Sequence, residues 1–350
     1  PLPSPLLPVE ERGKTLTRSE VTMTAAPDLP SFRPRPPWLT GDLQTLRNFL
    51  LRPRIDLEPW PAERLWLPVS GGDQLAACLH ARDRLGERPL VVLIHGLSGC
   101  EDSIYVRASA RFWLSLGHPV LRLNLRGSQP SRPRCAGHYH GGRSEDPHDA
   151  LDALLSRERA AARQGLILVG YSLGGNVLVK LLAEAGRQLP VRAAASVSAP
   201  IDLEATSERF HAPRNRVYLR WLLTLLKREA TAPPAELSAT EREAIEAART
   251  VREFDDRFIA PRFGFADAGD YYARCSGLRF LSDVEVPLAL LHADDDPWIP
   301  DDAYSRAAEV ANANLRVEIT RGGGHVGFHD QGDPQPWHDR AIEAFVREAG

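Results

Sequence analysis

Short apolar runs alternate with segments of helical length from Leu65 onward, and this alternation restricts the fold more than any other feature of the sequence. Six runs have the length and composition of buried strands: 90–95, 119–125, 166–171, 193–198, 287–292 and 315–320. Strands that are joined by crossover helices run parallel to one another. The alternation therefore predicts an α/β protein with a mainly parallel, doubly wound sheet.

Segments with helical patterning lie between these runs. They cover residues 105–116, 145–163, 174–185, 302–311 and 335–347. Two earlier runs, 64–69 and 74–80, flank a Gly-Gly pair, and this spacing predicts an antiparallel hairpin that leads into the sheet. The proline-rich segment 27–37 is expected to run along the surface, because proline cannot join a central ladder.

The interval from about 201 to 283 breaks the alternation, because it contains helical stretches such as 215–229 and 239–252 but no strand pattern. An insertion of this kind is most simply a helical cap over the carboxyl ends of the strands, where open α/β sheets bind ligands. We therefore expect one domain over 31–350 that carries this cap. Residues 1–30 are expected to be a disordered extension, since prolines interrupt them and no basic leader is present.

Charge and cysteine content exclude several classes of function. A net charge of −3, from 43 basic and 46 acidic residues, is too small to hold nucleic acid or an anionic membrane by electrostatics alone. Four separated cysteines form no Cys-x-x-Cys motif, which predicts reduced thiols and a cytoplasmic location without a zinc or redox site. No run approaches the ~20 apolar residues of a membrane span. A small or neutral substrate is expected.

The strongest signal for chemistry is the motif Gly-Tyr-Ser-Leu-Gly-Gly at 170–175, which follows a strand pattern and precedes a helical one. A serine on a tight strand-to-helix turn needs glycines two residues to either side, because a Cβ there would collide with the turn. The short pattern also arises by chance, so its interpretation as a nucleophile motif depends on the strand and helix predicted around it. Ser172 is the predicted nucleophile of a serine hydrolase.

A serine hydroxyl needs a base that takes its proton, and on this kind of turn the chain order is serine, acid, histidine. The histidines downstream of Ser172 are His211, His292, His325, His329 and His338. His325 is preferred because it follows three glycines directly after a strand pattern, on a loop at a strand end. His292, within a strand, and His329, further into the loop, are the alternatives. His95 precedes the serine and is expected to shape a loop.

Three consecutive carboxylates, Asp294, Asp295 and Asp296, follow the strand pattern that ends near residue 292. A carboxylate is needed to orient the histidine and to stabilise the imidazolium. Their place at a strand end, between the serine and the histidine, favours this role over that of a solvated turn. Asp296 is preferred and Asp295 stays open. Together these features predict the α/β-hydrolase fold with a helical cap.

The oxyanion of the tetrahedral intermediate needs N–H donors, and the loss of one costs on the order of 3 kcal/mol. The backbone N–H of Leu173 is expected to be one donor, because it begins the helix after the serine. The second is assigned to Leu97 in the segment 95–99, where a glycine lets the backbone approach closely.

Several elements lie together in one order: His-Gly-Leu-x-Gly at 95–99, Asn-Leu-Arg-Gly at 124–127, Tyr-His-Gly-Gly at 139–142, Gly-Tyr-Ser-Leu-Gly-Gly-Asn-Val at 170–177, Arg-Glu-Phe-Asp-Asp at 252–256, Gly-Phe at 264–265, Tyr-Tyr at 271–272, Asp-Asp-Pro at 295–297 and Gly-His-Val-Gly-Phe at 324–328. From about Phe32 onward the chain resembles the YheT-like branch of α/β hydrolases, which includes bacterial esterases, yeast medium-chain ethyl ester synthase/esterases and vertebrate lipid-directed relatives. The resemblance implies the triad Ser172, Asp296 and His325, and carboxylic-ester substrates.

The chain departs from that pattern at two places. It has Gly-Asp-Leu-Gln-Thr at 41–45, where relatives tend to carry a histidine before Leu-Gln-Thr. It also has Arg-Gly-Ser-Gln at 126–129, where a glycine-rich turn is usual. Both departures bear on the substrate pocket and leave the triad intact.

These features predict a serine esterase that cleaves short- to medium-chain acyl esters or lipid esters through an acyl-enzyme, without metal or cofactor. An acyltransferase would use the same residues, with an alcohol in place of water. A third interpretation is a lipid-surface-binding protein with a weak or dead active site, which uses the apolar stripe of segment 215–229: Trp221, Leu222, Leu223, Leu225 and Leu226. Such a stripe more often packs on its own core, so peripheral membrane contact through the cap is not favoured. Chain length, physiological substrate and oligomeric state stay open.

Overall fold

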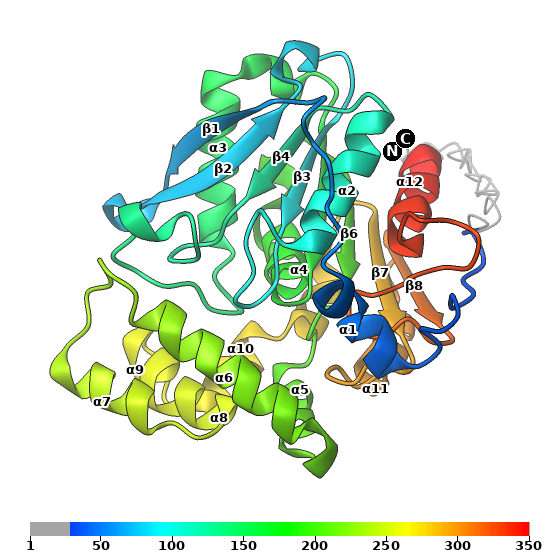
Figure 1. The fold of residues 1–350 in the computed structure, drawn as a ribbon. Coiled ribbons are helices and arrows are strands. Elements are labelled where there is room, and N and C mark those ends of the chain that lie inside the picture. The colour runs from blue at the N-terminus through cyan, green and yellow to red at the C-terminus, as the bar shows by residue number, and fades with distance from the viewer. Residues whose placement is uncertain (1–28, 350) are drawn as a thin grey trace, which may run out of the picture.

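An eight-stranded sheet with helices on both faces forms the centre of the computed structural model, which describes residues 29–349 (Figure 1). The strands are β1 Ala62–Pro68, β2 Gln74–His80, β3 Leu90–Ile94, β4 Val120–Leu123, β5 Leu166–Tyr171, β6 Val191–Val197, β7 Leu288–Ala293 and β8 Leu315–Thr320. Their spatial order is β1-β2-β4-β3-β5-β6-β7-β8. Among the described strands, β2 alone runs in the opposite direction to the others: it is antiparallel to β1 and β4, and all other neighbouring pairs are parallel. The predicted mainly parallel sheet and the hairpin that leads into it are confirmed.

Helices cover both faces of the sheet, so its central strands are buried along their whole length. These helices are α2 Ile104–Ser115, α3 Glu145–Arg157, α4 Leu173–Ala185, α11 Asp302–Ala308 and α12 Trp337–Ala349. α2 and α12 pack on one face, while α3, α4 and α11 pack on the other. Every residue of β3, β5 and β7 is buried, which explains why these strands read as continuous apolar runs without alternation.

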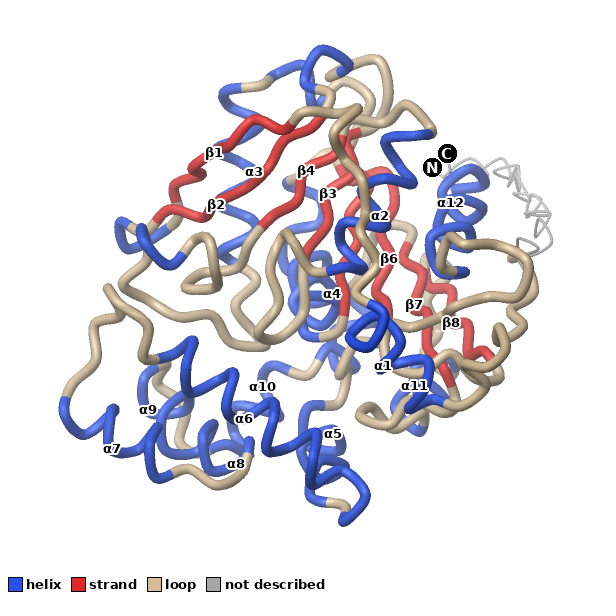
Figure 2. The backbone as a smooth tube through the Cα atoms, viewed as in Figure 1, coloured by secondary structure: helices blue, strands red, loops and turns tan. Residues whose placement is uncertain are grey.

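The chain between β6 and β7 forms a helical layer beyond the carboxyl ends of the strands (Figures 1 and 2). Its α-helices are α5 Leu203–His211, α6 Arg216–Ala230, α7 Ala239–Ala247, α8 Val251–Phe254, α9 Ala260–Arg262 and α10 Ala268–Cys275. This layer, called the cap below, has a hydrophobic core that includes Phe210, Leu226, Ile245 and Phe258. The single helix expected over 239–252 is wrong, because the backbone at Ala248 has a ψ of 131° and separates α7 from α8.

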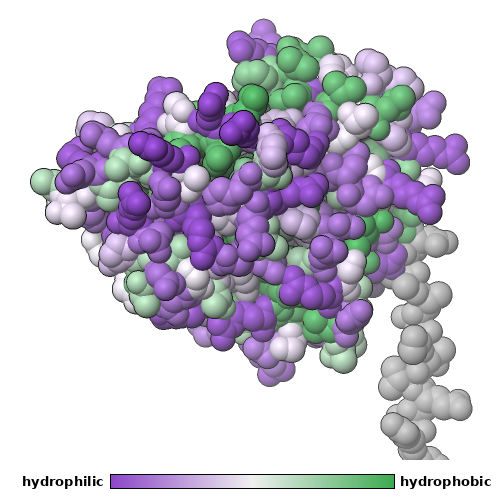
Figure 3. All heavy atoms as spheres, turned by 90° about the horizontal axis from the view of Figure 1, so that it is seen from below, coloured by the Kyte–Doolittle hydropathy of each residue, from purple (hydrophilic) through white to green (hydrophobic). Residues whose placement is uncertain are grey.

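The amphipathic stripe of α6 packs mainly inward. Leu222, Leu223 and Leu226 are buried in the core of the cap, as expected for a helix that covers its own domain. Val217 lies on the outer side, with 77% of its surface exposed, whereas Trp221, 44% exposed, lies beside Trp298, with ring centroids 6.3 Å apart. Figure 3 shows the cap side of the molecule, where hydrophilic residues predominate and hydrophobic ones gather in small groups. Within the described part of the chain, no helix is long and apolar enough to span a bilayer.

A helix that the sequence pattern did not predict, α1 Gly41–Leu51, lies beside the chain that follows β8 (Figure 1). Thr40 caps its N-terminus by accepting a hydrogen bond from the N–H of Leu43. Gly41 and Gln44 are its only buried residues, while its apolar side chains Leu43, Phe49, Leu50 and Leu51 are exposed, so the helix adds little to the core. The segment before it runs along the surface as expected, and most of the extension predicted for 1–30 lies outside the described residues.

Candidate active site

Ser172 occupies the turn between β5 and α4, with backbone angles φ 49° and ψ −125°. A positive φ is strained for a residue with a Cβ, and such strain is typical of a serine held on a sharp turn. The two flanking glycines have no room for a side chain. A Cβ on Gly170 would lie 2.5 Å from the carbonyl oxygen of Gly174, and one on Gly174 would lie 2.3 Å from that of His95. The motif is therefore required by close packing.

A line of hydrogen bonds joins the three residues of the predicted triad. Nε2 of His325 lies 2.9 Å from Oγ of Ser172, and Nδ1 of His325 lies 2.8 Å from Oδ2 of Asp296. The other carboxylate oxygen, Oδ1, accepts hydrogen bonds from the N–H groups of Trp298 and Ile299, at 2.8 and 3.1 Å. With Nδ1–H donated to the carboxylate, Nε2 faces the serine as an acceptor, which is the tautomer a general base needs.

Burial and charge define the environment of this line. Asp296 is 2% exposed and His325 is 8% exposed. Burial acts to raise the pKa of Asp296, but the charge and hydrogen bond of His325 outweigh it and hold that pKa below its usual value. The indole of Trp298 covers the imidazole, with ring centroids 4.4 Å apart. Asp296 is thus an ionised partner for the histidine in a site that is largely closed to water.

The three consecutive carboxylates have different partners. Asp294 accepts a hydrogen bond from the N–H of Gly322 at 2.7 Å, and Asp295 accepts one from the N–H of Gly324 at 2.8 Å. Only Asp296 reaches His325. The structure therefore separates the preferred acid from its alternative: Asp294 and Asp295 hold the glycine turn that precedes the histidine.

The other histidines lie away from the serine. His292 is buried within β7 and its ring stacks on that of Tyr304, with ring centroids 4.0 Å apart. His329 makes no hydrogen bond with Ser172 and lies beside Arg47. Nδ1 of His95 donates a hydrogen bond to the carbonyl oxygen of Gly96 at 2.7 Å, and its Nε2 accepts one from the N–H of Leu125 at 3.0 Å. This is the loop-shaping position expected from the sequence.

Leu173 and Leu97 present the two backbone N–H groups that were assigned to the oxyanion. Leu173 is the first residue of α4, where N–H groups have no intrahelical acceptor. Within residues 29–349, the N–H of Leu173 and that of Leu97 have no hydrogen-bond acceptor. The loop that carries Leu97 passes directly beside the nucleophile, since a Cβ on Gly96 would lie 2.8 Å from Cβ of Ser172.

Tyrosine hydroxyls hold the N–H groups on either side of Leu97. The N–H of Gly96 donates to the hydroxyl of Tyr105 at 2.9 Å, and the N–H of Ser98 donates to the hydroxyl of Tyr139 at 2.8 Å. Leu97 is left between them with an unpaired N–H. This arrangement suits a donor that waits for a developing negative charge.

Two residues of α1 support the histidine loop, and sequence reasoning assigned neither of them a role. Oγ1 of Thr45 accepts a hydrogen bond from the N–H of His325 at 2.8 Å. Oε1 of Gln44 accepts one from the N–H of His329 at 2.7 Å, while its Nε2 donates to the carbonyl oxygen of the same residue. The signal was the Leu-Gln-Thr element at 43–45, for which the sequence analysis noted only that the histidine expected before it is absent.

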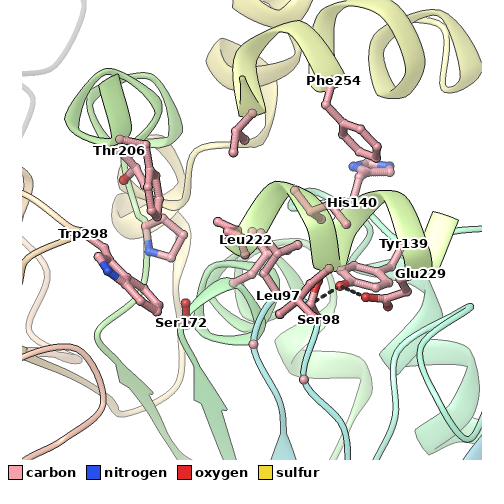
Figure 4. A pocket seen from close by; sticks show the side chains of 18 of the residues that line it. Leu97, Ser98, Tyr139, His140, Ser172, Thr206, Leu222, Glu229, Phe254 and Trp298 are labelled. Carbon is pink, nitrogen blue, oxygen red and sulfur yellow. Dashed lines mark hydrogen bonds between the residues drawn. The ribbon is translucent and has the colours of Figure 1, made fainter. Parts of the chain in front are cut away.

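A cavity of about 500 Å³ lies above Ser172, between the strand ends and the cap. Figure 4 shows Ser172 at its floor, with Trp298 on one side, Leu97 on the other and Phe254 of the cap above. Most of its wall is apolar: Phe49, Leu97, Leu173, Leu203, Phe210, Trp221, Leu222, Leu225, Leu226, Val251, Phe254, Phe258, Ile259, Trp298, Ile299 and Val326. This volume is within the ~300–1,000 Å³ of typical small-molecule sites.

Two acids of the cap, Glu229 and Asp255, interrupt this apolar wall. Asp255 accepts a hydrogen bond from the hydroxyl of Tyr272 at 2.7 Å, and Glu229 accepts one from Tyr139 at 3.4 Å. Burial raises the pKa of each carboxyl to about 7. Within the described residues, no three or more His, Cys, Asp or Glu side chains are grouped so that they could hold a metal ion. Sequence reasoning gave neither acid a role.

The strand order, the serine turn and the hydrogen-bonded line from serine to aspartate are those of an α/β hydrolase. A family model described as alpha/beta hydrolase fold matches residues 89–331. The chain therefore belongs to the α/β-hydrolase family.

Relatives within the family agree with the resemblance read from the sequence. The Escherichia coli (strain K12) protein named "Putative esterase YheT" is 34% identical, over 94% of this chain and 97% of its own, which confirms the YheT-like assignment. "Phospholipase ABHD3" of Mus musculus is 28% identical over 74% of this chain and 64% of its own. "Monoacylglycerol lipase" of Saccharomyces cerevisiae is 27% identical over 74% of this chain and 59% of its own.

Among solved structures, an esterase of Pyrococcus furiosus, Pf2001, is similar with a TM-score of 0.57 and 18% identity, over 83% of this chain and 92% of its own. At this identity the likeness concerns the fold. The expected class of enzyme, a carboxylic ester hydrolase, fits the names of all these relatives.

Proposed function

We propose that this protein hydrolyses carboxylic esters of short- to medium-chain acids, or lipid esters, through an acyl-enzyme on Ser172. The observation that supports the proposal most is the line of hydrogen bonds from Ser172 through His325 to Asp296, at the floor of an apolar cavity of about 500 Å³. The names of the relatives, esterase, phospholipase and monoacylglycerol lipase, point to the same bond type.

In the acylation step, Nε2 of His325 takes the proton of Ser172 as Oγ attacks the ester carbonyl carbon. The carbonyl oxygen becomes an oxyanion, which the N–H groups of Leu97 and Leu173 bind. When the intermediate collapses, the bond from carbon to the alcohol oxygen breaks and His325 returns the proton to that oxygen. Asp296 holds the imidazole and stabilises its positive charge throughout.

In the deacylation step, a water molecule takes the place of the alcohol. His325 accepts a proton from the water molecule while the water oxygen attacks the acyl carbon. The same two N–H groups bind the second oxyanion. The bond to Oγ then breaks, His325 returns the proton to Ser172, and the carboxylic acid leaves. If an alcohol enters instead of water, the same steps give a new ester.

The test is the hydrolysis of p-nitrophenyl esters from acetate to palmitate by wild type and Ser172→Ala. We expect turnover by wild type, with a loss of at least about a thousandfold in the variant. The wild type should also be labelled by a fluorophosphonate probe, and Ser172→Ala should not. Turnover by wild type that does not exceed that of the variant on any ester would contradict the proposal. The ratio of acid to ethyl ester, measured in water with ethanol added, separates hydrolysis from acyl transfer.

A further inference from the structure

Glu229 of α6 is an acid in the apolar cavity that the proposed reaction does not use. Its Oε2 accepts a hydrogen bond from the hydroxyl of Tyr139 at 3.4 Å. Its Oε1 is buried and has no partner within hydrogen-bond distance among residues 29–349, and the same is true of the hydroxyl of Ser98, which faces this carboxylate. A buried carboxylate oxygen without a partner is unfavourable, so its retention calls for an explanation.

Tyr139 connects this acid to the loop of the oxyanion donors. Its hydroxyl accepts the hydrogen bond of the Ser98 N–H at 2.8 Å, next to Leu97 in the chain. Figure 4 shows the hydroxyl between Ser98 and the carboxylate of Glu229, with dashed lines for the two hydrogen bonds. The cap and the oxyanion loop therefore meet at one hydroxyl group.

The direction of that hydroxyl proton decides what Ser98 can bind. A tyrosine hydroxyl has one proton and lone pairs on its oxygen. When the proton is donated to Glu229, the lone pairs are free to accept from Ser98. Ser98 also has a φ of 52°, a left-handed conformation that a residue with a Cβ adopts only when its surroundings hold it.

We propose that Glu229 is a positioning residue: through the hydroxyl of Tyr139 it holds Ser98, and thereby turns the Leu97 N–H toward the oxyanion. The inference rests on the proposed ester hydrolysis at Ser172 and adds a link from the cap to the oxyanion hole. Glu229 lines the cavity, but its proposed effect passes through Tyr139 to the transition state and does not require contact with the acyl chain. We therefore expect changes in kcat that do not depend on the acyl chain.

The link from Glu229 through Tyr139 to Ser98 is expected to depend on pH. Burial raises the pKa of Glu229 to about 7, while its hydrogen bonds and the charge of Arg132 act to lower it. The hydroxyls of Tyr139 and Ser98 face the carboxyl group, and the guanidinium of Arg132, from the turn after β4, donates to the backbone carbonyl oxygen of Glu229 at 3.5 Å. A protonated Glu229 is a weaker acceptor for the Tyr139 proton, so the loop is held best when the carboxylate is ionised.

The experiment compares Glu229→Gln, Glu229→Leu and Tyr139→Phe with wild type, and uses Glu243→Leu, at an exposed glutamate of α7, as the matched control. kcat and KM are measured on p-nitrophenyl acetate and octanoate across neutral pH. We expect Glu229→Leu and Tyr139→Phe to lose about tenfold in kcat on both esters, with little change in KM, because one oxyanion donor is misaligned rather than removed. Glu229→Gln keeps an acceptor, so it should retain most of kcat but lose the rise in kcat that follows ionisation of Glu229.

Two results would overturn the inference. A rise in KM that is larger for octanoate than for acetate would show that Glu229 contacts substrate, and unchanged kcat in Glu229→Leu and Tyr139→Phe would show that it positions nothing. The rate of fluorophosphonate labelling, which also develops charge in the oxyanion hole, tests the link even when the ester hydrolysis proposal fails. If Glu229→Leu does not fold, Tyr139→Phe and the pH profile of Glu229→Gln decide the question.

Discussion

The two walls of the cavity are built in different ways. On the sheet side, Ser172, Asp296 and His325 stand at the ends of strands and bind one another. On the cap side, helices inserted between β6 and β7 present apolar side chains, together with Glu229 and Asp255, whose pKa values burial raises to about 7. The three residues on the sheet side are thus hydrogen-bonded to one another, whereas on the cap side Oε1 of Glu229 is buried without a hydrogen-bond partner among the described residues. We infer that the reaction depends on the sheet side and that the cap modulates it.

The largest effect is expected on the sheet side, where substitutions of two neighbouring carboxylates can be compared. Asp296→Asn should lower kcat by about 10⁴-fold, because the amide cannot stabilise the imidazolium or fix its tautomer. Asp295→Asn should lower it about tenfold at most, since its Oδ1 can still accept from the N–H of Gly324. Steady-state kinetics on p-nitrophenyl butyrate distinguish the two. Equal losses would mean that the two carboxylates share the role, against the geometry at His325.

The next effect concerns the stability of the cap, tested at two positions of one helix. Leu222 is 6% exposed and Val217 is 77% exposed on α6. Leu222→Asp should lower the free energy of unfolding by about 3 kcal/mol, because it places a carboxylate in the cap core, whereas Val217→Asp should change it by less than about 0.5 kcal/mol. Urea unfolding followed by tryptophan fluorescence measures both. A comparable loss at Val217 would show that the outer side of α6 is also covered.

A smaller effect is expected where α1 supports the histidine loop. Thr45→Val keeps the shape of the side chain but removes the acceptor of the His325 N–H. The loss of this hydrogen bond should raise the activation free energy by about 1–2 kcal/mol, because the imidazole is less well aligned, and lower kcat about tenfold. Thr45→Ser keeps the hydroxyl and should retain most of the activity. If Thr45→Val had the kcat of wild type, α1 would be a structural element without influence on the site.

The smallest effect is a dependence of stability on pH at Glu229. Its pKa is raised from the ordinary 4.5 to about 7 by burial, so the folded state binds the proton more tightly than the unfolded chain does. The stability contributed by this group is therefore full below about 4.5 and is lost as the pH rises toward 7. Glu229→Gln should match wild type in acid and be more stable than wild type above neutrality. Thermal unfolding at both pH values provides the measurement, and a constant difference would contradict the shift.

Much of the sheet could be predicted because buried strands carry their own signal. The bounds of β2, β5 and β8 agree with the expected runs 74–80, 166–171 and 315–320, and α6 begins and ends one residue later than expected. The helix α1 was missed, and the residues that it buries are Gly41 and Gln44 rather than its apolar side chains. Its position depends on hydrogen bonds with a distant loop, which no local pattern contains.

By itself the sequence determined the fold class and predicted Ser172 as the nucleophile, because the motif at 170–175 is local and the strand and helix around it are patterned within a few residues. Only the tertiary structure decided which aspartate faces His325, how Thr45 holds the same histidine, and that Glu229 meets Tyr139. These pairs are separated by 29, 280 and 90 positions in the chain. Such contacts exist only after the sheet and the cap have closed on one another, and single carboxylates or hydroxyls carry no sequence signal of where that closure will place them.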